Sequence, residues 1–371
     1  MRLKVFCILF FAFAFFGVSQ NELSENNSNT IDKQSNRASF PSLLVGATLN
    51  YEELGTKKER LFLKDFKYLT PANAAKQSAI HPEPGKWNWD KINDFIDFAN
   101  KNHLTVRMHA PVSPQASKWA KADHRTAEEL TQNMEEYVTA ISQRFNVEPS
   151  IKYMDVVNET ILPDGSWFGP KEGVHQWENP WINMGYDENG YPLYILKAFE
   201  IATKYAPNLK LVYNQNAGME DKLWDKVKET VLYVRSKGYR VDGIGWQGHI
   251  LLGAKRKDFI DNMDATIQKM SDLIDWAHAH DLAFHVTELD YLVKDEFKKE
   301  LKPERENQKK LYDKIVNLLI EKSKQGEVTL NLWDLSVRHK KGTGDFQSIY
   351  NKKFKPTPAY FSIQRALKAS H

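Results

Sequence analysis

The stretch Ile151-Lys-Tyr-Met-Asp-Val-Val-Asn-Glu159 has the pattern of a buried β-strand that delivers an amide and a carboxylate at its carboxyl end. Charged groups resist desolvation, and strand ends lead into loops, where function concentrates. A second apolar run, Ala283-Phe-His-Val-Thr-Glu-Leu-Asp290, ends in the same way around Glu288. Two glutamates at the ends of separate strands suit the cleavage of a glycosidic bond. Taken singly, each motif fits an unrelated loop carboxylate equally well.

Outward from these two runs, short apolar segments alternate with amphipathic helical stretches. Strands are predicted at 43–49, 68–70, 104–109, 151–157, 210–214, 241–246, 283–288 and 328–332. Helices are predicted between them, among others at 89–101, 127–145, 193–205, 223–238, 262–280 and 309–325. This alternation indicates an α/β protein with a parallel sheet. Eight units in about 330 residues favour a single-domain (β/α)₈ TIM barrel over an open doubly wound sheet. No glycine-rich phosphate loop follows the first strand.

A barrel of this kind places its functional groups at the carboxyl ends of several strands. Polar residues lie at those points of the sequence, and residues two apart point to the same side of a strand. The candidate site residues, in strand order from two to eight, are Asn73, Lys76, His109, Asn158, Glu159, Gln247, His249, Glu288, Asp290 and Trp333.

Retaining glycoside hydrolysis requires one carboxylic acid and one nucleophilic carboxylate. We assign the acid to Glu159 and the nucleophile to Glu288. Asn158 would bind a sugar hydroxyl, His249 would keep Glu288 ionised, and Asp290 would lie behind the histidine.

Several of these positions also allow a plain structural interpretation. A histidine such as His249 is more often a hydrogen-bonded core residue, and Gln247 could satisfy backbone groups. Asp155, which precedes the site on its strand, is predicted to be a buried, hydrogen-bonded structural group. Four aromatic residues fit either sugar stacking or packing of their own loop, namely Trp167, Phe168, Trp177 and Trp181.

The amino terminus is typical of an exported protein. Residues 1–20 combine a basic start with an apolar core and small residues, as a signal peptide does, and a retained membrane anchor is the weaker alternative. Residues 21–40 are polar and predicted to be a flexible linker, so 41–371 would form the catalytic domain. The only cysteine is Cys7, so no disulfide is expected in the mature chain. We expect a secreted or periplasmic protein without a membrane span.

The net charge of the chain is close to zero and argues neither for nor against any particular partner. The formal charge is +3, from 51 basic and 48 acidic residues, and falls to +1 without the first 20 residues. No basic run resembles a nucleic-acid footprint. A metal site is not expected, because His278 and His280 are two apart on a helix and face in different directions. We expect a monomer that needs no cofactor and binds a polysaccharide or oligosaccharide.

Several motifs, in this order along the chain, resemble those of family 10 of the glycoside hydrolases, the endo-β-1,4-xylanases. The resemblance covers roughly residues 42 to 366. The motifs are Thr70-Pro-Ala-Asn-Ala-Ala-Lys76, Val106-Arg-Met-His109, Asp155-Val-Val-Asn-Glu159, Val241-Asp-Gly-Ile-Gly-Trp-Gln-Gly-His249 and Val286-Thr-Glu-Leu-Asp290. The resemblance implies that Glu159 is the acid/base, Glu288 the nucleophile and His249 its partner. It also implies sugar-binding roles for Asn73, Lys76, His109, Asn158, Gln247 and Trp333.

The chain departs from the family at positions expected to grip the sugar. Ala72, Gln77 and Ser113 stand where the family usually has Glu, Trp and Trp, and the segment 338–344 lacks the usual Ser-Trp. The resemblance therefore implies a retaining endo-glycosidase acting on β-1,4-xylan or a decorated xylan. The alternatives are a hydrolase of the same family acting on another polysaccharide, and a non-catalytic glycan-binding barrel.

Overall fold

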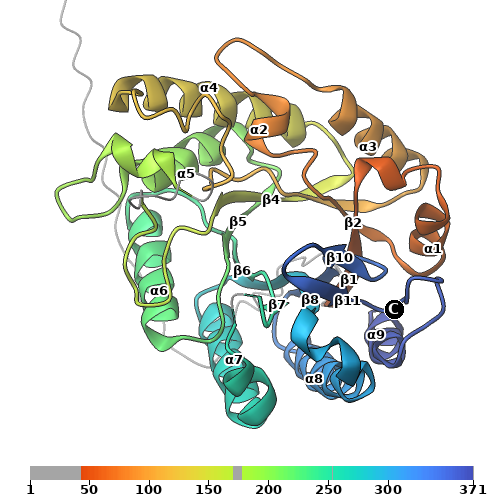
Figure 1. Ribbon diagram of the computed structural model, residues 1–371. Coiled ribbons are helices and arrows are strands. Elements are labelled where there is room, and N and C mark those ends of the chain that lie inside the picture. Colours follow the sequence, from red (N-terminus) through yellow and green to blue (C-terminus); the bar gives the residue numbers. More distant parts are fainter. Residues whose placement is uncertain (1–42, 170–177, 253, 371) are drawn as a thin grey trace, which may run out of the picture. The chain divides into compact units, whose positions relative to one another are not determined.

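The computed structural model describes residues 43–169, 178–252 and 254–370 (Figure 1). The predicted signal peptide at 1–20 and linker at 21–40 lie outside the described residues. The described chain forms a closed parallel barrel with helices around it, which confirms the predicted (β/α)₈ fold.

Eight strands make the barrel. They are β1 (Leu43–Leu49), β2 (Tyr68–Pro71), β3 (Thr105–Met108), β4 (Ile151–Asn158), β5 (Lys210–Gln215), β6 (Gly243–Trp246), β8 (Ala283–Lys294) and β9 (Val328–Leu332). Each is parallel to its neighbours, and β9 pairs with both β8 and β1, so the sheet closes on itself. Closure removes the free edges that an open sheet would expose.

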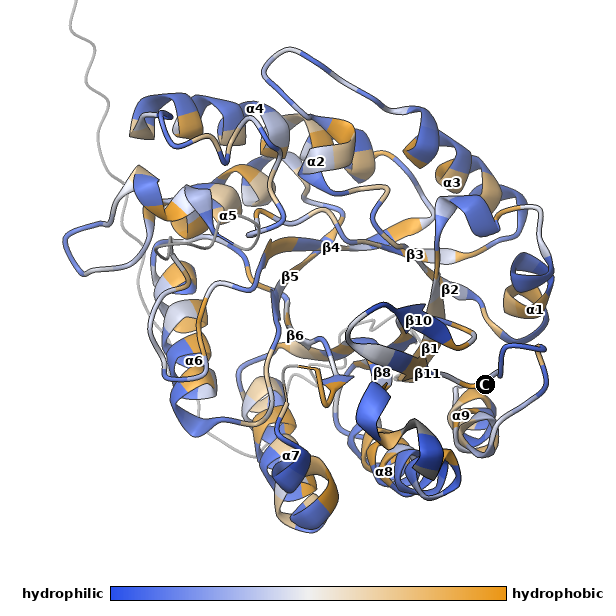
Figure 2. Cartoon of the chain, in the orientation of Figure 1, coloured by the Kyte–Doolittle hydropathy of each residue, from blue (hydrophilic) through white to orange (hydrophobic). Residues whose placement is uncertain are grey.

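The helices form an outer ring around these strands (Figure 1). They are α1 (Lys57–Asp65), α2 (Gln77–Ile80), α3 (Asp90–Lys101), α4 (Ala127–Asn146), α5 (Leu193–Tyr205), α6 (Asp221–Ser236), α7 (Met263–Ala279), α8 (Leu301–Lys322) and α9 (Pro358–Ala369). Apolar and polar positions alternate around each of them in Figure 2. One face of each long helix can therefore cover the barrel while the other meets water.

Helix α4 illustrates how the sequence sets an element's start and inner face. The Thr126 hydroxyl accepts a hydrogen bond from the Glu129 amide at 3.1 Å, and the Glu129 carboxylate accepts one from the Thr126 amide at 2.9 Å. This capping box satisfies two amides that have no partner within the helix. Leu130, Met134 and Tyr137 are then buried at helical spacing against the barrel.

The barrel strands are buried on both faces, as parallel strands covered by helices are. Glycine makes room inside the barrel for functional side chains. A Cβ atom at Gly245 on β6 would lie 2.4 Å from Asn214 Oδ1. Glycine at this position therefore lets Asn214 turn into the barrel beneath the cavity described below.

Strand β8 is twice as long as predicted, because its apolar alternation continues past Glu288 to Lys294. Beyond the barrel it pairs with the short strand β7 (His249–Ile250) and with an antiparallel hairpin of β10 (Arg338–Lys340) and β11 (Gly344–Gln347). The hairpin was not predicted. Helix α8 also begins eight residues before its predicted start, at Leu301 instead of Lys309.

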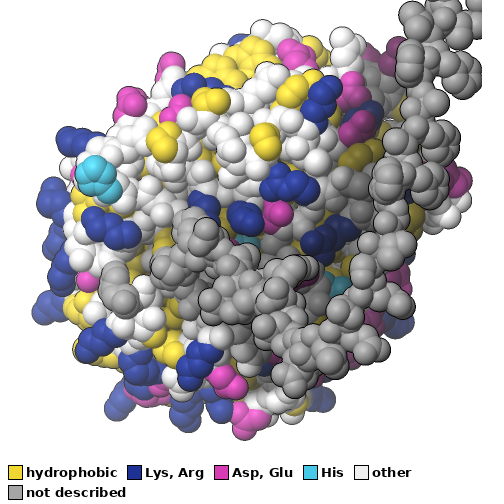
Figure 3. All heavy atoms as spheres, turned by 180° about the vertical axis from the view of Figure 1, so that it is seen from behind, with side chains coloured by type: hydrophobic (Ala, Val, Ile, Leu, Met, Phe, Trp, Pro, Cys, Tyr) yellow, Lys and Arg dark blue, Asp and Glu magenta, His cyan; other side chains and the backbone are white. Residues whose placement is uncertain are grey.

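The face turned away from the view of Figure 1 carries Lys and Arg side chains interspersed with Asp and Glu (Figure 3). Among the described residues, no helix combines the length and apolar character needed to cross a bilayer.

Candidate active site

A cavity of about 620 Å³ opens at the carboxyl ends of the barrel strands. Eight of the ten predicted site residues line it, namely Asn73, Lys76, His109, Glu159, Gln247, His249, Glu288 and Trp333. The other two, Asn158 and Asp290, are buried beside it. The strand ends therefore bring residues from five motifs, together with Trp333, into one site, although Asn73 and Trp333 are 260 positions apart in sequence.

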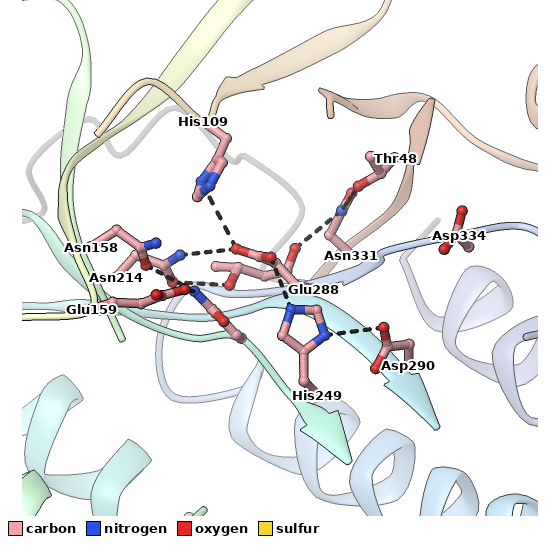
Figure 4. A network of polar contacts seen from close by, with 12 residues as sticks. Thr48, His109, Asn158, Glu159, Asn214, His249, Glu288, Asp290, Asn331 and Asp334 are labelled. Carbon is pink, nitrogen blue, oxygen red and sulfur yellow. Dashed lines mark hydrogen bonds and ion pairs between the residues drawn. The ribbon is translucent and has the colours of Figure 1, made fainter. Parts of the chain in front are cut away.

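Glu288 is a buried carboxylate of the cavity wall, with 3 % of its surface exposed. Asn214 Nδ2 donates to its Oε1 at 3.2 Å, and His249 Nε2 lies 3.2 Å from its Oε2 (Figure 4). His109 Nδ1 lies 3.9 Å from Oε1. These contacts fix the carboxylate from several sides, which suits the role of nucleophile predicted for Glu288 from the sequence.

The charges around Glu288 keep it ionised. Burial alone would raise its pKa, but the positive charges of His109, His249 and Arg107 outweigh burial and hold the pKa well below its usual range. Burial alone would likewise lower the pKa of His249. The negative charges of Asp290 and Glu288 outweigh this effect of burial and raise the pKa of His249 to about 10.

Asp290 supports His249 from behind. Its Oδ2 lies 3.0 Å from His249 Nδ1, an ion-pair contact whose angle departs from hydrogen-bond geometry. The imidazole thus lies between two carboxylates, Glu288 and Asp290 (Figure 4). This is the placement expected from the sequence for both residues.

Glu159 lies directly after strand β4 and is held in a different way. Its φ of 55° is in the left-handed region, which a residue with a side chain adopts at a local cost. Gln247 Nε2 donates to Glu159 Oε1 and to Asn158 Oδ1, both at 2.9 Å. Glu159 is partly exposed to the cavity, and its hydrogen bond comes from a neutral amide. The two glutamates therefore occupy electrostatically different environments, as unequal roles require.

A buried ion pair supports the site from below. Asp155 Oδ2 accepts hydrogen bonds from Arg107 and, at 2.7 Å, from His109 Nδ1. Arg107 Nη2 also donates at 2.8 Å to the carbonyl of Thr287, the residue before Glu288. The prediction that Asp155 is a buried, hydrogen-bonded group is confirmed. It also couples the position of His109 to the strand that carries Glu288.

Trp333 and Lys76 form a wall of the cavity. The rings of His109 and His249 each meet the Trp333 indole edge-to-face, with centroids 5.9 Å apart. The Lys76 ammonium lies 5.9 Å from the centre of that ring and donates to Gln115. Burial lowers the pKa of Lys76, although the nearby carboxylates of Glu288 and Glu159 oppose it.

Three of the positions that depart from the family pattern, Ala72, Gln77 and Ser113, do not line the cavity in the described structure. Ala72 is buried. Gln77 is also buried, and it donates to the His81 carbonyl at 2.9 Å and accepts from the Ser117 amide at 2.5 Å. The Ser113 carbonyl accepts a hydrogen bond from Trp181 Nε1 at 3.1 Å. All three residues are buried, and none of them presents a side chain to the cavity.

The aromatic residues after strand four were predicted either to stack on sugar or to pack within their own loop, and the structure places them differently from one another. Phe168 lines the cavity, whereas Trp181 is 1 % exposed and belongs to the core. Trp167 packs on Tyr191 and under the Lys226 ammonium. Trp177 lies outside the described residues.

Sequence reasoning missed several cavity residues. Sequence reasoning also missed Asn214, which is buried and contacts Glu288 from the second-last position of β5, although the polar run Asn214-Gln-Asn216 at that strand end could have revealed it. Gln115, Arg338 and Lys340 belong to loops or to the hairpin, where no periodicity marks them. In the described part of the chain, no group of three His, Cys, Asp or Glu side chains is arranged to hold a metal ion.

The strand ends of this closed (β/α)₈ barrel present two glutamates in a polar cavity. Cations keep one of them ionised, and an amide holds the other. This combination of fold and site defines a barrel glycoside hydrolase. Comparison with known proteins gives the particular family. The model of glycosyl hydrolase family 10 matches residues 33–366. The chain belongs to glycosyl hydrolase family 10.

Curated relatives and solved structures agree with this. The chain is 29 % identical over 340 residues to endo-1,4-beta-xylanase A of Caldicellulosiruptor saccharolyticus, covering 86 % of this chain and 92 % of the relative. It is 26 % identical to beta-1,4-xylanase of Dictyoglomus thermophilum, covering 82 % and 83 %. The crystal structure of xylanase B from Clostridium stercorarium F9 superposes with a TM-score of 0.70 at 21 % identity, over 86 % and 96 %. The last likeness concerns the fold.

Replacing His249 by Gln tests the charge that keeps Glu288 ionised. The pKa of Glu288 is depressed partly by His249, so removing that cation raises the pKa. With Glu288 in its predicted role as nucleophile, attack requires the ionised carboxylate, so the acid limb of the kcat/KM profile should move to higher pH. A pH–rate profile with a chromogenic xyloside measures it. An acid limb that stays in place, or moves to lower pH, would show that His249 does not govern this ionisation.

Proposed function

We propose that the protein is a retaining endo-β-1,4-xylanase that uses Glu159 as acid/base and Glu288 as nucleophile. The observation that carries the proposal is the unequal treatment of the two glutamates. Cations and an amide surround Glu288, whereas Glu159 is partly exposed and accepts from a neutral amide. The relatives that are xylanases by name favour xylan as the substrate.

In this mechanism Glu159 protonates the oxygen of the leaving sugar while Glu288 attacks the anomeric carbon. The glycosidic bond breaks and an ester between Glu288 and the sugar forms. Glu159, now a carboxylate, takes a proton from water, and that water displaces Glu288 from the sugar. Gln247 orients Glu159 through its 2.9 Å hydrogen bond.

The remaining side chains hold the sugar and the two glutamates. Asn158 has a buried Nδ2 with no hydrogen-bond partner among the described residues, and we assign it to a sugar hydroxyl next to the reacting carbon. Trp333 offers an indole for a sugar ring, and Asn73, Lys76 and His109 offer polar atoms to hydroxyl groups. His249 and Asp290 position Glu288.

We further propose that the protein is exported as a monomer. Residues 1–20 would be removed as a signal peptide, 21–40 would act as a linker, and 41–371 would form the catalytic domain. The pattern of a basic start and an apolar core supports this proposal.

A panel of purified polysaccharides with reducing-end detection tests the proposed function. We expect product from β-1,4-xylans, and a lower kcat/KM for unsubstituted linear xylan than for substituted xylan, because Ala72, Gln77 and Ser113 do not contact the cavity. Product from another glycan alone would favour a related hydrolase. Binding without product from any glycan would favour a glycan-binding barrel.

A further inference from the structure

The hairpin of β10 and β11 brings basic side chains to the cavity. Arg338 and Lys340 of β10 line it together with Phe346 of β11. The hairpin continues the sheet of β8, the strand that carries Glu288, with Phe346 opposite Leu292 and Gly344 opposite Lys294. Its position relative to the nucleophile is therefore set by backbone pairing.

Glycine permits this close approach. Gly344 has a φ of 143°, and a Cβ atom there would lie 2.3 Å from the Val293 carbonyl oxygen. Gly342, in the turn of the hairpin, has a φ of 73°. These two positions accept other residues only with strain, so the hairpin's geometry is built into the sequence.

Arg338 is held in place but keeps hydrogen-bonding capacity. Its Nε donates to Asp334 Oδ2 at 2.6 Å, and its guanidinium lies 4.3 Å from the centre of the Phe346 ring. Among the described residues, neither Nη nitrogen makes a hydrogen bond, although Nη2 lies 3.9 Å from Asp290 Oδ2. A fixed guanidinium with free Nη groups suits a planar or tetrahedral oxyanion.

Lys340 is exposed and has no ion-pair partner in the described part of the chain. The carboxylates of the cavity already have other partners, since Asp334 is bound by Arg338, Glu288 by His249 and Glu159 by Gln247. A neutral xylan chain offers no charge for this ammonium group. An anionic group on the sugar would supply the missing partner.

Resting on the proposed function, we propose that Arg338 and Lys340 form a subsite for an anionic substituent, a carboxylate or a sulfate ester, on the xylan chain near the cleavage point. Charge-assisted hydrogen bonds are about twice as strong as neutral ones. An anionic substituent should therefore bind these two side chains more tightly than a neutral branch of the same shape. The subsite would then select decorated over plain chains.

Matched pairs of oligosaccharides test the subsite. One pair is a xylo-oligosaccharide with a glucuronic acid branch and its carboxyl-reduced twin, and the other is a sulfated xylo-oligosaccharide and its desulfated twin. We expect kcat/KM to be about tenfold higher for the anionic member of at least one pair, and the ratio to fall with added salt. The pair that shows the preference identifies the anion as carboxylate or sulfate.

Lys340→Gln should lower this ratio about tenfold. Lys341→Gln is the matched control, because it removes the same charge from the next residue, which does not line the cavity, and should leave the ratio unchanged. A wild-type ratio near one for both pairs, or an equal effect of the two variants, would overturn the subsite.

Calorimetry with Glu288→Gln separates this inference from the proposed function, because it measures binding without turnover. Equal binding or cleavage of both twins would reject the anionic subsite and leave the xylanase proposal standing. Tighter binding of the anionic twin without any cleavage by the wild-type chain would keep the subsite and reject the proposed activity. A chain that binds neither twin would overturn both.

Discussion

Glu288→Gln should lower kcat on xylo-oligosaccharides by on the order of 10⁵-fold or more, because an oriented intramolecular nucleophile contributes at least that much as effective molarity. The amide has nearly the shape of the carboxylate but cannot form the glycosyl ester. Folding and sugar binding should persist, since the cavity keeps its shape. Steady-state kinetics, with thermal melting and calorimetry on the same preparation, measure the three properties.

The control is Glu188→Gln, the same chemical change at a side chain that is 78 % exposed and does not line the cavity. It should leave kcat at the wild-type value. Retention of more than a few per cent of wild-type activity by Glu288→Gln, with deamidation excluded by mass spectrometry, would show that another group is the nucleophile.

Glu159→Ala should have a large effect that depends on the leaving group. Loss of a general acid costs about 10²–10⁴-fold when the leaving group is a sugar, which needs a proton. An aryl xyloside with an acidic phenol leaves without one, so formation of the ester on Glu288 should slow far less. Pre-steady-state kinetics with aryl xylobiosides of graded phenol pKa would measure this dependence.

The same variant also lacks the base that activates water. Added azide, which needs no deprotonation, should restore turnover of the aryl substrate and give a glycosyl azide. Asn158→Ala provides the comparison, because it removes a neighbouring side chain without removing the acid. An equal loss for all leaving groups, with no effect of azide, would mean that Glu159 serves structure and not proton transfer.

The barrel itself was predictable because the local pattern and the global fold agree. Strands 43–49 and 328–332 are short segments rich in Leu and Val, and their observed bounds match the predicted ones. Placement of the site at the carboxyl ends of the strands followed from the barrel. It predicted that Glu159 and Glu288 share one site although 129 positions separate them, and both line the same cavity.

The parts that sequence did not reveal depend on contacts between distant segments. Asn214 contacts Glu288 only because Gly245 leaves space for it, and no local pattern encodes this. The extension of β8 to Lys294 is stabilised by pairing with a hairpin more than forty residues later. The sequence prediction ended this strand at Glu288, on the assumption that a carboxylate marks a strand end. Glu288 can stay buried within the strand because Asn214 and His249 bind its carboxylate.

The departures from the family pattern were visible in the sequence, but their structural result was not. Ser113 and Gln77 could have formed altered sugar contacts, but the Ser113 hydroxyl accepts from the Gln115 amide and the Gln77 amide donates to the His81 carbonyl. Arg338 and Lys340, in the segment 338–344 that also departs from the family pattern, do line the cavity. Side-chain direction in loops is set by tertiary packing, which a single sequence does not specify.

The anomeric configuration of the first product tests the central claim, a double displacement through Glu288, most directly. Proton NMR during the first minutes of xylo-oligosaccharide hydrolysis reads the configuration before mutarotation mixes the anomers. Two successive inversions at the same carbon predict that the β-anomer appears first. Initial appearance of the α-anomer would contradict the mechanism, because it would mean that water attacks directly and that Glu288 never bonds to the sugar.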